Sequence, residues 1–129
     1  MTLIESFRLA VAPHLTEAEL RCLLDAAERD DPALVQDKTT SPTLYEGGGC
    51  RPDATCEGAC ALGYVAWKTR GLTTVGEVRV AFREMVERMP DSVGQFLAVF
   101  DTRPRPEVIA DLKVALKEAL NARATSQAA

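Results

Sequence analysis

The cysteines are the residues of this chain whose type and spacing could do chemistry. Cys50, Cys56 and Cys60 lie within one stretch of eleven residues, and Cys22 lies 28 residues before Cys50. A cluster of thiols indicates a metal site, a redox couple, a disulfide or a closely packed helix face. The sequence therefore raises one chemical question, and it concerns these four side chains.

A metal or redox site is the first interpretation of the cluster. A helix that begins near Asp53 would place Cys56 and Cys60 one turn apart on one face, with Cys50 in the loop before it. The partial positive charge at a helix N-terminus lowers the pKa of a nearby thiol and favours the thiolate that binds metals. Cys22 would then supply the fourth ligand of a single zinc or iron–sulfur centre.

Close packing is the second interpretation. Zinc sites commonly use two short Cys-x2–4-Cys pairs, whereas Cys-x5-Cys-x3-Cys contains one short pair. Cysteine also behaves as a small buried hydrophobic residue, and a helix face of small residues lets a neighbouring helix approach closely. Both interpretations stay open from the sequence. The small residues of this segment are Cys56, Gly58, Ala59, Cys60, Ala61 and Gly63.

The other polar residues do not form a complete catalytic set. His14 is the one histidine, so it is a further candidate for a fourth metal ligand, but no nucleophile pattern accompanies it. The Gly47–Gly49 run lacks the Lys-Ser/Thr that follows in a phosphate-binding loop. The charged run Glu28–Asp31 predicts a solvated helix end. Tyr64 and Trp67 are expected to pack in the core, with a ligand-pocket wall as the alternative.

The pattern of apolar residues predicts an all-α fold, a compact bundle of about six short antiparallel helices. Two helix starts carry a capping box, in which Thr16 pairs with Glu19 and Thr74 pairs with Glu77. We expect one helical domain over 1–123, with a Gly- and Thr-rich irregular loop at 37–52 and a disordered tail at 124–129. The expected helices lie near 3–12, 16–28, 53–70, 74–89, 91–100 and 106–122.

Composition and charge exclude several classes of protein. The 129 residues fit one domain, and the 47% of hydrophobic residues can supply its core without a stabilising disulfide or metal. The formal net charge of −4 argues against a general nucleic-acid binder. No stretch approaches the roughly 20 apolar residues of a membrane span, and the N-terminus lacks a secretory pattern. We therefore expect a cytoplasmic protein with reduced thiols and no membrane or nucleic-acid partner.

One family resemblance rests on three segments of the chain. Ala61–Leu72 is an apolar run with a late Trp and Gly, and Val78–Pro90 is a short amphipathic run that ends in proline. Together with Thr16–Ala27, these segments resemble the bacterial effector-associated, death-like helical adaptor domains over roughly half the chain. The Gly-rich, Cys-bearing stretch 37–61 departs from that family. The resemblance implies an adaptor that recruits partners through helix–helix contacts and has no catalytic residues of its own.

From the sequence we expect a small protein–protein interaction domain, an adaptor without catalysis of its own. The regular helix pattern and the absence of a complete catalytic set motivate this expectation. The expected partner is another protein or a second copy of this chain. The alternative is a thiolate metal-binding or thiol-redox protein that uses Cys50, Cys56 and Cys60.

Overall fold

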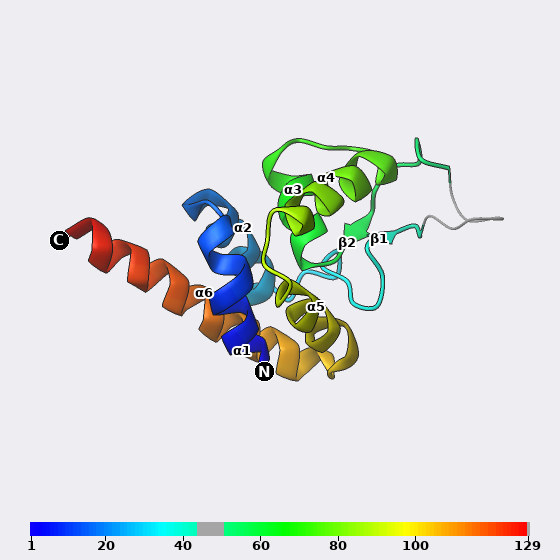
Figure 1. The fold of residues 1–129 in the computed structure, drawn as a ribbon. Coiled ribbons are helices and arrows are strands. Elements are labelled where there is room, and N and C mark those ends of the chain that lie inside the picture. Colours follow the sequence, from blue (N-terminus) through cyan, green and yellow to red (C-terminus); the bar gives the residue numbers. More distant parts are fainter. Residues whose placement is uncertain (44–50, 129) are drawn as a thin grey trace.

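The computed structural model describes residues 1–43 and 51–128, and it confirms the all-α class. A π-helix, η1, and a 3-10 helix, η2, prolong the first helix, and a pair of two-residue strands joins two loops (Figure 1). The elements in chain order are α1 (Leu3–Ser6), η1 (Phe7–Val11), η2 (Ala12–His14), α2 (Glu17–Glu28), β1 (Thr40–Ser41), β2 (Gly58–Ala59), α3 (Ala61–Thr69), α4 (Val75–Glu87), α5 (Val93–Thr102) and α6 (Arg105–Ala128).

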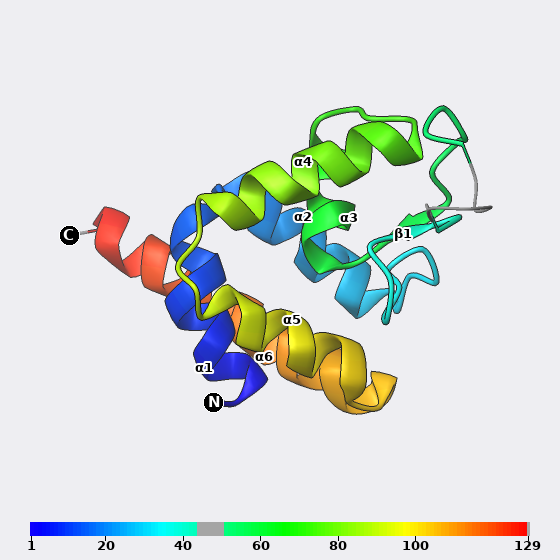
Figure 2. The same cartoon turned by 45° about the vertical axis from the view of Figure 1, so that its right-hand side comes forward.

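The helices form two groups that meet at α2 (Figure 1 and Figure 2). In the first group α1 packs against α5 and α6, and in the second group α3 packs against α4. Helix α2 contacts both α6 and α3, so it connects the two groups. The long helix α6 contacts α1 and α2 and runs behind α1 in both views, and its C-terminal half extends beyond the other helices.

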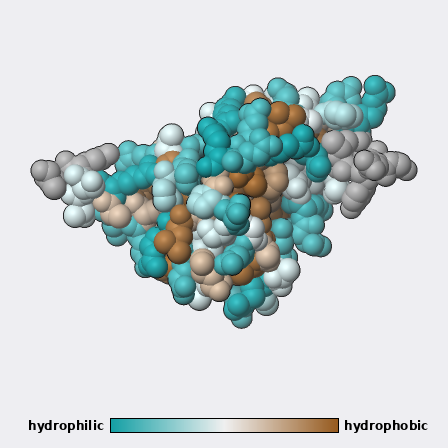
Figure 3. All heavy atoms as spheres, viewed as in Figure 1, coloured by the Kyte–Doolittle hydropathy of each residue, from teal (hydrophilic) through white to brown (hydrophobic). Residues whose placement is uncertain are grey.

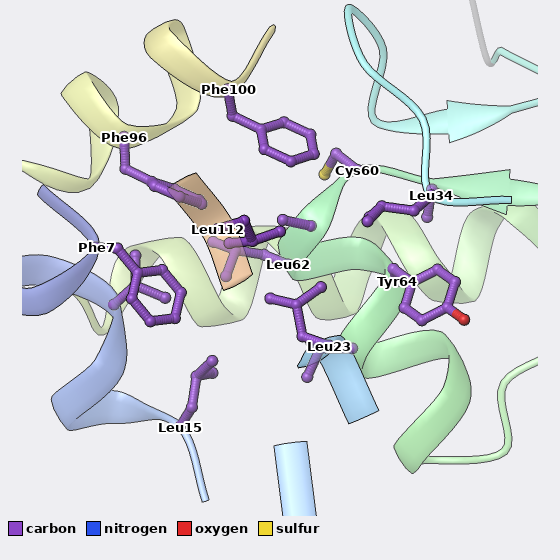
Figure 4. Packing of buried hydrophobic residues seen from close by; sticks show 14 of the residues in the cluster. Phe7, Leu15, Leu23, Leu34, Cys60, Leu62, Tyr64, Phe96, Phe100 and Leu112 are labelled. Atoms are coloured by element: carbon purple, nitrogen blue, oxygen red, sulfur yellow. The ribbon is translucent and has the colours of Figure 1, made fainter. Parts of the chain in front are cut away.

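Aromatic rings from α5 and from the first helical segment, which consists of α1, η1 and η2, meet in the core (Figure 4). Phe7, Phe96 and Phe100 are buried, with ring centroids 5.6 Å apart for Phe7 and Phe96 and 5.9 Å apart for Phe96 and Phe100. Leu62 of α3 and Leu112 of α6 lie beside them. Burying one such side chain contributes about 1.5–3 kcal/mol relative to leaving it exposed. The shared core therefore holds both helix groups together.

Both predicted capping boxes are confirmed. Thr16 Oγ1 accepts from the N–H of Glu19 at 3.1 Å, and Glu19 Oε1 accepts from the N–H of Thr16 at 2.9 Å. Thr74 and Glu77 repeat this exchange at the start of α4, at 3.2 and 3.1 Å. Each box satisfies backbone donors that a helix start leaves unpaired, which is typically worth about 1 kcal/mol.

The first helix differs from a regular α-helix near its end. After Ser6 the chain widens into η1, where the N–H of Ala12 donates to the carbonyl of Phe7, five residues earlier. Pro13 lies inside η2 and has no backbone N–H to donate, so the helix ends at this point. The predicted helix over 3–12 is therefore present as three short segments in succession.

The predicted start of the third helix near Asp53 is wrong, because α3 begins at Ala61. Residues 57–60 are extended and bond instead to the segment 33–41. The N–H of Glu57 donates to Ser41 O at 2.7 Å, and the N–H of Cys60 donates to Thr39 O at 3.0 Å. A Cβ on Gly58 would lie 3.0 Å from Ala33 O, so the absence of a side chain permits this close approach.

The last helix is longer than its predicted range of 106–122. Helix α6 runs from Arg105 to Ala128, so residues 124–128 of the expected disordered tail are helical in the structure. Its expected apolar face points toward the body, but Ala119 and Leu120 are only partly buried. None of the helices in the described part of the chain is long and apolar enough to cross a membrane.

Candidate functional site

Cys60 occupies the N-cap position of α3, and its side chain points into the core. It is 3% exposed, and its sulfur faces Phe100 (Figure 4). Burial raises the pKa of the Cys60 thiol to about 11, although the nearby backbone N–H groups of Gly63 and Leu62 act in the opposite direction. The helix N-terminus therefore does not produce a thiolate here. Cys60 behaves as a buried packing residue.

Cys56 lies in extended backbone just before β2, so it does not share a helix face with Cys60. Its N–H donates to Thr73 O at 2.8 Å, and its thiol donates to Gly58 O at 3.2 Å. The side chain is 4% exposed, and burial raises its pKa. The predicted i, i+4 pair of thiols is wrong because the helix that would carry it begins only after both residues.

The three described cysteines are free thiols and do not form a ligand set. Cys22 lies on α2, partly buried, and burial followed by the charge of Asp25 raises its pKa. Within residues 1–43 and 51–128, no three Cys, His, Asp or Glu side chains are grouped so that they could hold a metal ion. Cys50 lies outside the described residues. The zinc or iron–sulfur centre of Cys50, Cys56, Cys60 and Cys22 therefore stays a prediction.

Tyr64, which the sequence predicted to pack in the core, also connects α3 to the turn after α2 through its hydroxyl group. Its ring is buried, and its hydroxyl donates to Asp31 Oδ2 at 2.7 Å. Asp31 also accepts from the N–H of Ala33 at 2.9 Å and lies 3.4 Å from Arg29 Nη2. These contacts lower the pKa of the Asp31 carboxyl group. The hydrogen bond from the Ala33 N–H has the largest effect, and the one from the Tyr64 hydroxyl comes second. Burial, with Asp31 adding to it, raises the pKa of Tyr64.

A second anchor connects the same turn to the start of α6. Arg105 Nε donates to Asp30 Oδ1 at 2.9 Å, and its Nη atoms donate to Leu34 O and Asp31 O at 2.6 and 2.9 Å. Glu28, Arg29 and Asp30 are exposed, as predicted for a solvated helix end, and the turn is in addition a junction between α2, α3 and α6. Asp30 and Asp31 have structural partners, and this leaves no free acidic cluster at the turn.

His14 and Trp67 show no arrangement for catalysis. His14 is exposed in η2. Trp67 is partly buried and lies edge-to-face with Tyr64, at 5.9 Å between ring centroids. Lys68 Nζ lies 3.9 Å from the centroid of the Trp67 ring, which is a cation–π contact. Trp67 and Lys68 therefore pack against each other and against Tyr64 on α3.

A groove between the first helical segment and α6 is the best candidate for a binding site. It has a volume of about 230 Å³, and small or apolar side chains from both elements form its floor. Figure 3, viewed as Figure 1, shows hydrophobic residues between polar ones where the first helical segment and α6 meet. Arg123 closes one end by donating through Nη2 to the carbonyls of Ala12 and Leu15. The groove is lined by Arg8, Ala12, Pro13, Ala115, Glu118, Ala119, Ala122 and Arg123.

Charged side chains border this groove on both sides. Arg8 lies on the first helical segment, and Glu118 and Arg123 lie on α6. Arg8 and Glu118 have no ion-pair partner within the described ranges, and both bonds of Arg123 use the same nitrogen. The floor is apolar, and the rim carries charges of both signs. This arrangement can receive a helix that has small or apolar residues on one face.

Sequence reasoning missed this groove, although one pattern in α6 could have indicated it. Ala115, Ala119 and Ala122 are spaced by four and three residues, so they form a stripe of small residues along the helix. Such a stripe is typical of close helix packing. Its other wall, Ala12 and Pro13, lies about a hundred residues earlier in the sequence, and only the fold brings the two together.

Comparisons with protein-family models, with curated proteins and with solved structures found no match to this chain.

Proposed function

We propose that this protein is a helical interaction module that binds a helix of a protein partner in the groove between the first helical segment and α6 and has no catalysis of its own. The observation that carries the proposal is the groove itself, in which an apolar floor of alanines lies between Arg8 on one wall and Glu118 on the other. A partner helix gains burial from the floor and orientation from the rim. The site offers shape and charge, and none of Cys22, Cys56 and Cys60 lines it.

The described thiols support this function over a thiol-based one. Burial raises the pKa of Cys22, Cys56 and Cys60, which disfavours the thiolate that a nucleophilic or redox-active cysteine needs. Their free state fits the reducing cytoplasm, where we propose the protein works. The resemblance to effector-associated helical adaptor domains fits a role in recruitment.

Substitution of Ala122 by Arg tests the proposal, because Ala122 is exposed and lines the groove. Arg favours helix about as well as other straight-chain residues, so the fold is retained while the floor is blocked. Asn121→Arg is the matched control, since Asn121 is the exposed neighbour that does not line the groove. Circular dichroism and thermal unfolding should be the same for both variants.

The measurement is partner binding in two steps. Wild-type protein and both variants are used as bait in extract of the source cells, and retained proteins are compared by quantitative mass spectrometry. A candidate partner is then purified and its dissociation constant is measured with each bait. We expect Ala122→Arg to weaken binding at least about tenfold and Asn121→Arg to leave it within about twofold. Equal binding by the two variants would refute the groove as the docking site.

A further inference from the structure

The loop between α2 and β1 is held on the C-terminal end of α5 (Figure 1). Gln36 Nε2 donates to the carbonyls of Phe100 and Arg103, both at 2.8 Å, and so satisfies acceptors that the end of a helix leaves unpaired. The N–H of Asp37 donates to Asp101 Oδ1 at 3.0 Å. We call these hydrogen bonds the α5 latch.

The latch holds the middle of a segment that has bonds on both sides of it. The N–H of Val35 donates to Ala59 O at 2.9 Å, and the N–H of Glu57 donates to Ser41 O at 2.7 Å. Between them, Asp37 has a φ of 65°, a left-handed conformation that costs free energy in a residue other than glycine and persists where surrounding contacts hold it. Release of the latch therefore frees the loop between α2 and β1.

Asp101 places a carboxylate where its charge is disfavoured. It lies in the last turn of α5, at the negative end of the helix dipole, and it is only partly exposed. Neither Asp101 nor Asp37 forms an ion pair within residues 1–43 and 51–128. Burial raises the pKa of Asp101 and the charge of Asp37 adds to this effect, although the hydrogen bond from the Asp37 N–H acts in the opposite direction.

The other charged groups around the latch do not neutralise this carboxylate. Arg103 and Arg105 follow it in the chain, and each lies beside a different carboxylate, at 3.3 and 2.9 Å. Lys38 is exposed and forms no ion pair within the described ranges. Burial, with the charge of Asp101 adding to it, raises the pKa of the Cys60 thiol at the start of α3 to about 11, so this thiol is neutral near pH 7.

We propose that the α5 latch is strengthened by acid, so that protonation of Asp101 tightens the hold of α5 on the loop between α2 and β1 and ionisation loosens it. The proton goes to Oδ2, which leaves Oδ1 to accept from the N–H of Asp37. The cost of the charge is fully present above the raised pKa of Asp101 in the latched state. It disappears as the pH falls through that pKa toward the ordinary value of about 3.9.

Hydrogen–deuterium exchange of the full chain from pH 7 to pH 4, followed by mass spectrometry, measures release of the latch. Rates for peptides that cover 34–41 are corrected for the intrinsic exchange rate at each pH. We expect protection of this segment in wild type to rise at least about twofold as the pH falls. Asp101→Asn keeps the acceptor oxygen and removes the charge, so its protection should be high and independent of pH. Asp91→Asn, at an exposed aspartate outside the latch, is the matched control and should follow wild type.

Two further measurements separate the latch from other effects of pH. Gln36→Ala removes the hydrogen bonds to α5 and should speed exchange of 34–41 at every pH. In urea unfolding, Asp101→Asn should be more stable than wild type at pH 7, and this difference should become smaller as the pH falls toward about 3.9. Wild-type protection of 34–41 that does not rise on acidification would overturn the inference, and so would an equal rise in Asp101→Asn.

Discussion

Replacing Tyr64 by Phe removes one oxygen and tests the junction between α2 and α3. The aromatic ring is kept, so the core loses no apolar volume, and the hydrogen bond of 2.7 Å to Asp31 is lost. A hydrogen bond to a charged group contributes about 1.5–3 kcal/mol to stability. Asp31 keeps the Ala33 N–H and Arg29 as partners, which reduces the cost of the lost bond. We therefore expect a loss of about 1–2 kcal/mol in the free energy of unfolding at pH 7.

The pH dependence of this loss follows from the Asp31 carboxylate. Its pKa is lowered in the folded protein, so its contribution is fully present above its unfolded pKa, near 3.9. The contribution disappears as the pH falls through the lower, folded pKa, because protonation removes the charge that strengthens the bond. The difference between wild type and Tyr64→Phe should therefore be largest near neutral pH and should become smaller as the pH falls below the unfolded value of about 3.9 toward the lower, folded pKa of Asp31.

The assay is urea unfolding followed by far-ultraviolet circular dichroism, with a thiol reductant present. A double-mutant cycle of Tyr64→Phe with Asp31→Ala separates the pairwise interaction from other effects of each change. We expect a coupling free energy of about 1 kcal/mol at pH 7 that approaches zero in acid. A coupling below about 0.3 kcal/mol at pH 7 would refute the charge-assisted bond as the cause.

Two further predictions concern the thiols and the core. In folded protein at pH 8, an alkylating reagent should modify Cys22 well before Cys60, because Cys60 is 3% exposed and its pKa is raised to about 11. Peptide mass mapping of a time course measures the two modification rates. Equal rates would contradict the prediction. Leu112→Ala should lower the free energy of unfolding by about 2–5 kcal/mol, since Leu112 is fully buried. Leu9→Ala, at a leucine that is 53% exposed, is the matched control and should change it by no more than about 0.5 kcal/mol. Similar losses for the two leucines would contradict the assigned core.

The parts of the fold that were predicted correctly depend on neighbours in sequence. Each capping box joins residues three apart, so Thr16 with Glu19 and Thr74 with Glu77 could be recognised without any tertiary information. The same is true of the end of α3, where Gly71 has the positive φ of 66° that favours glycine. Helix class and most helix ends follow from such local patterns.

The start of α3 could not be predicted in this way. The segment 53–60 contains residues compatible with a helix, and its backbone instead bonds to partners in 33–41 and at Thr73. The isolated segment gives no indication of these partners, since they lie about fifteen to twenty-five residues away. Tertiary hydrogen bonds therefore overrode local propensity, and the predicted thiol pair on one helix face was lost with the helix.

The sequence by itself determined the helix class, the helix caps and the apolar faces, because these depend on spacings of three and four residues along one helix. Only the tertiary structure decided what the chemical groups do. Burial, which depends on residues from α5 and α6 as well as α3, raised the pKa of Cys60 and made it a packing residue. Likewise, packing of α6 against the first helical segment formed the groove between Arg8 and Glu118. Burial and electrostatic environment arise from residues distant in sequence, and a linear pattern does not contain them.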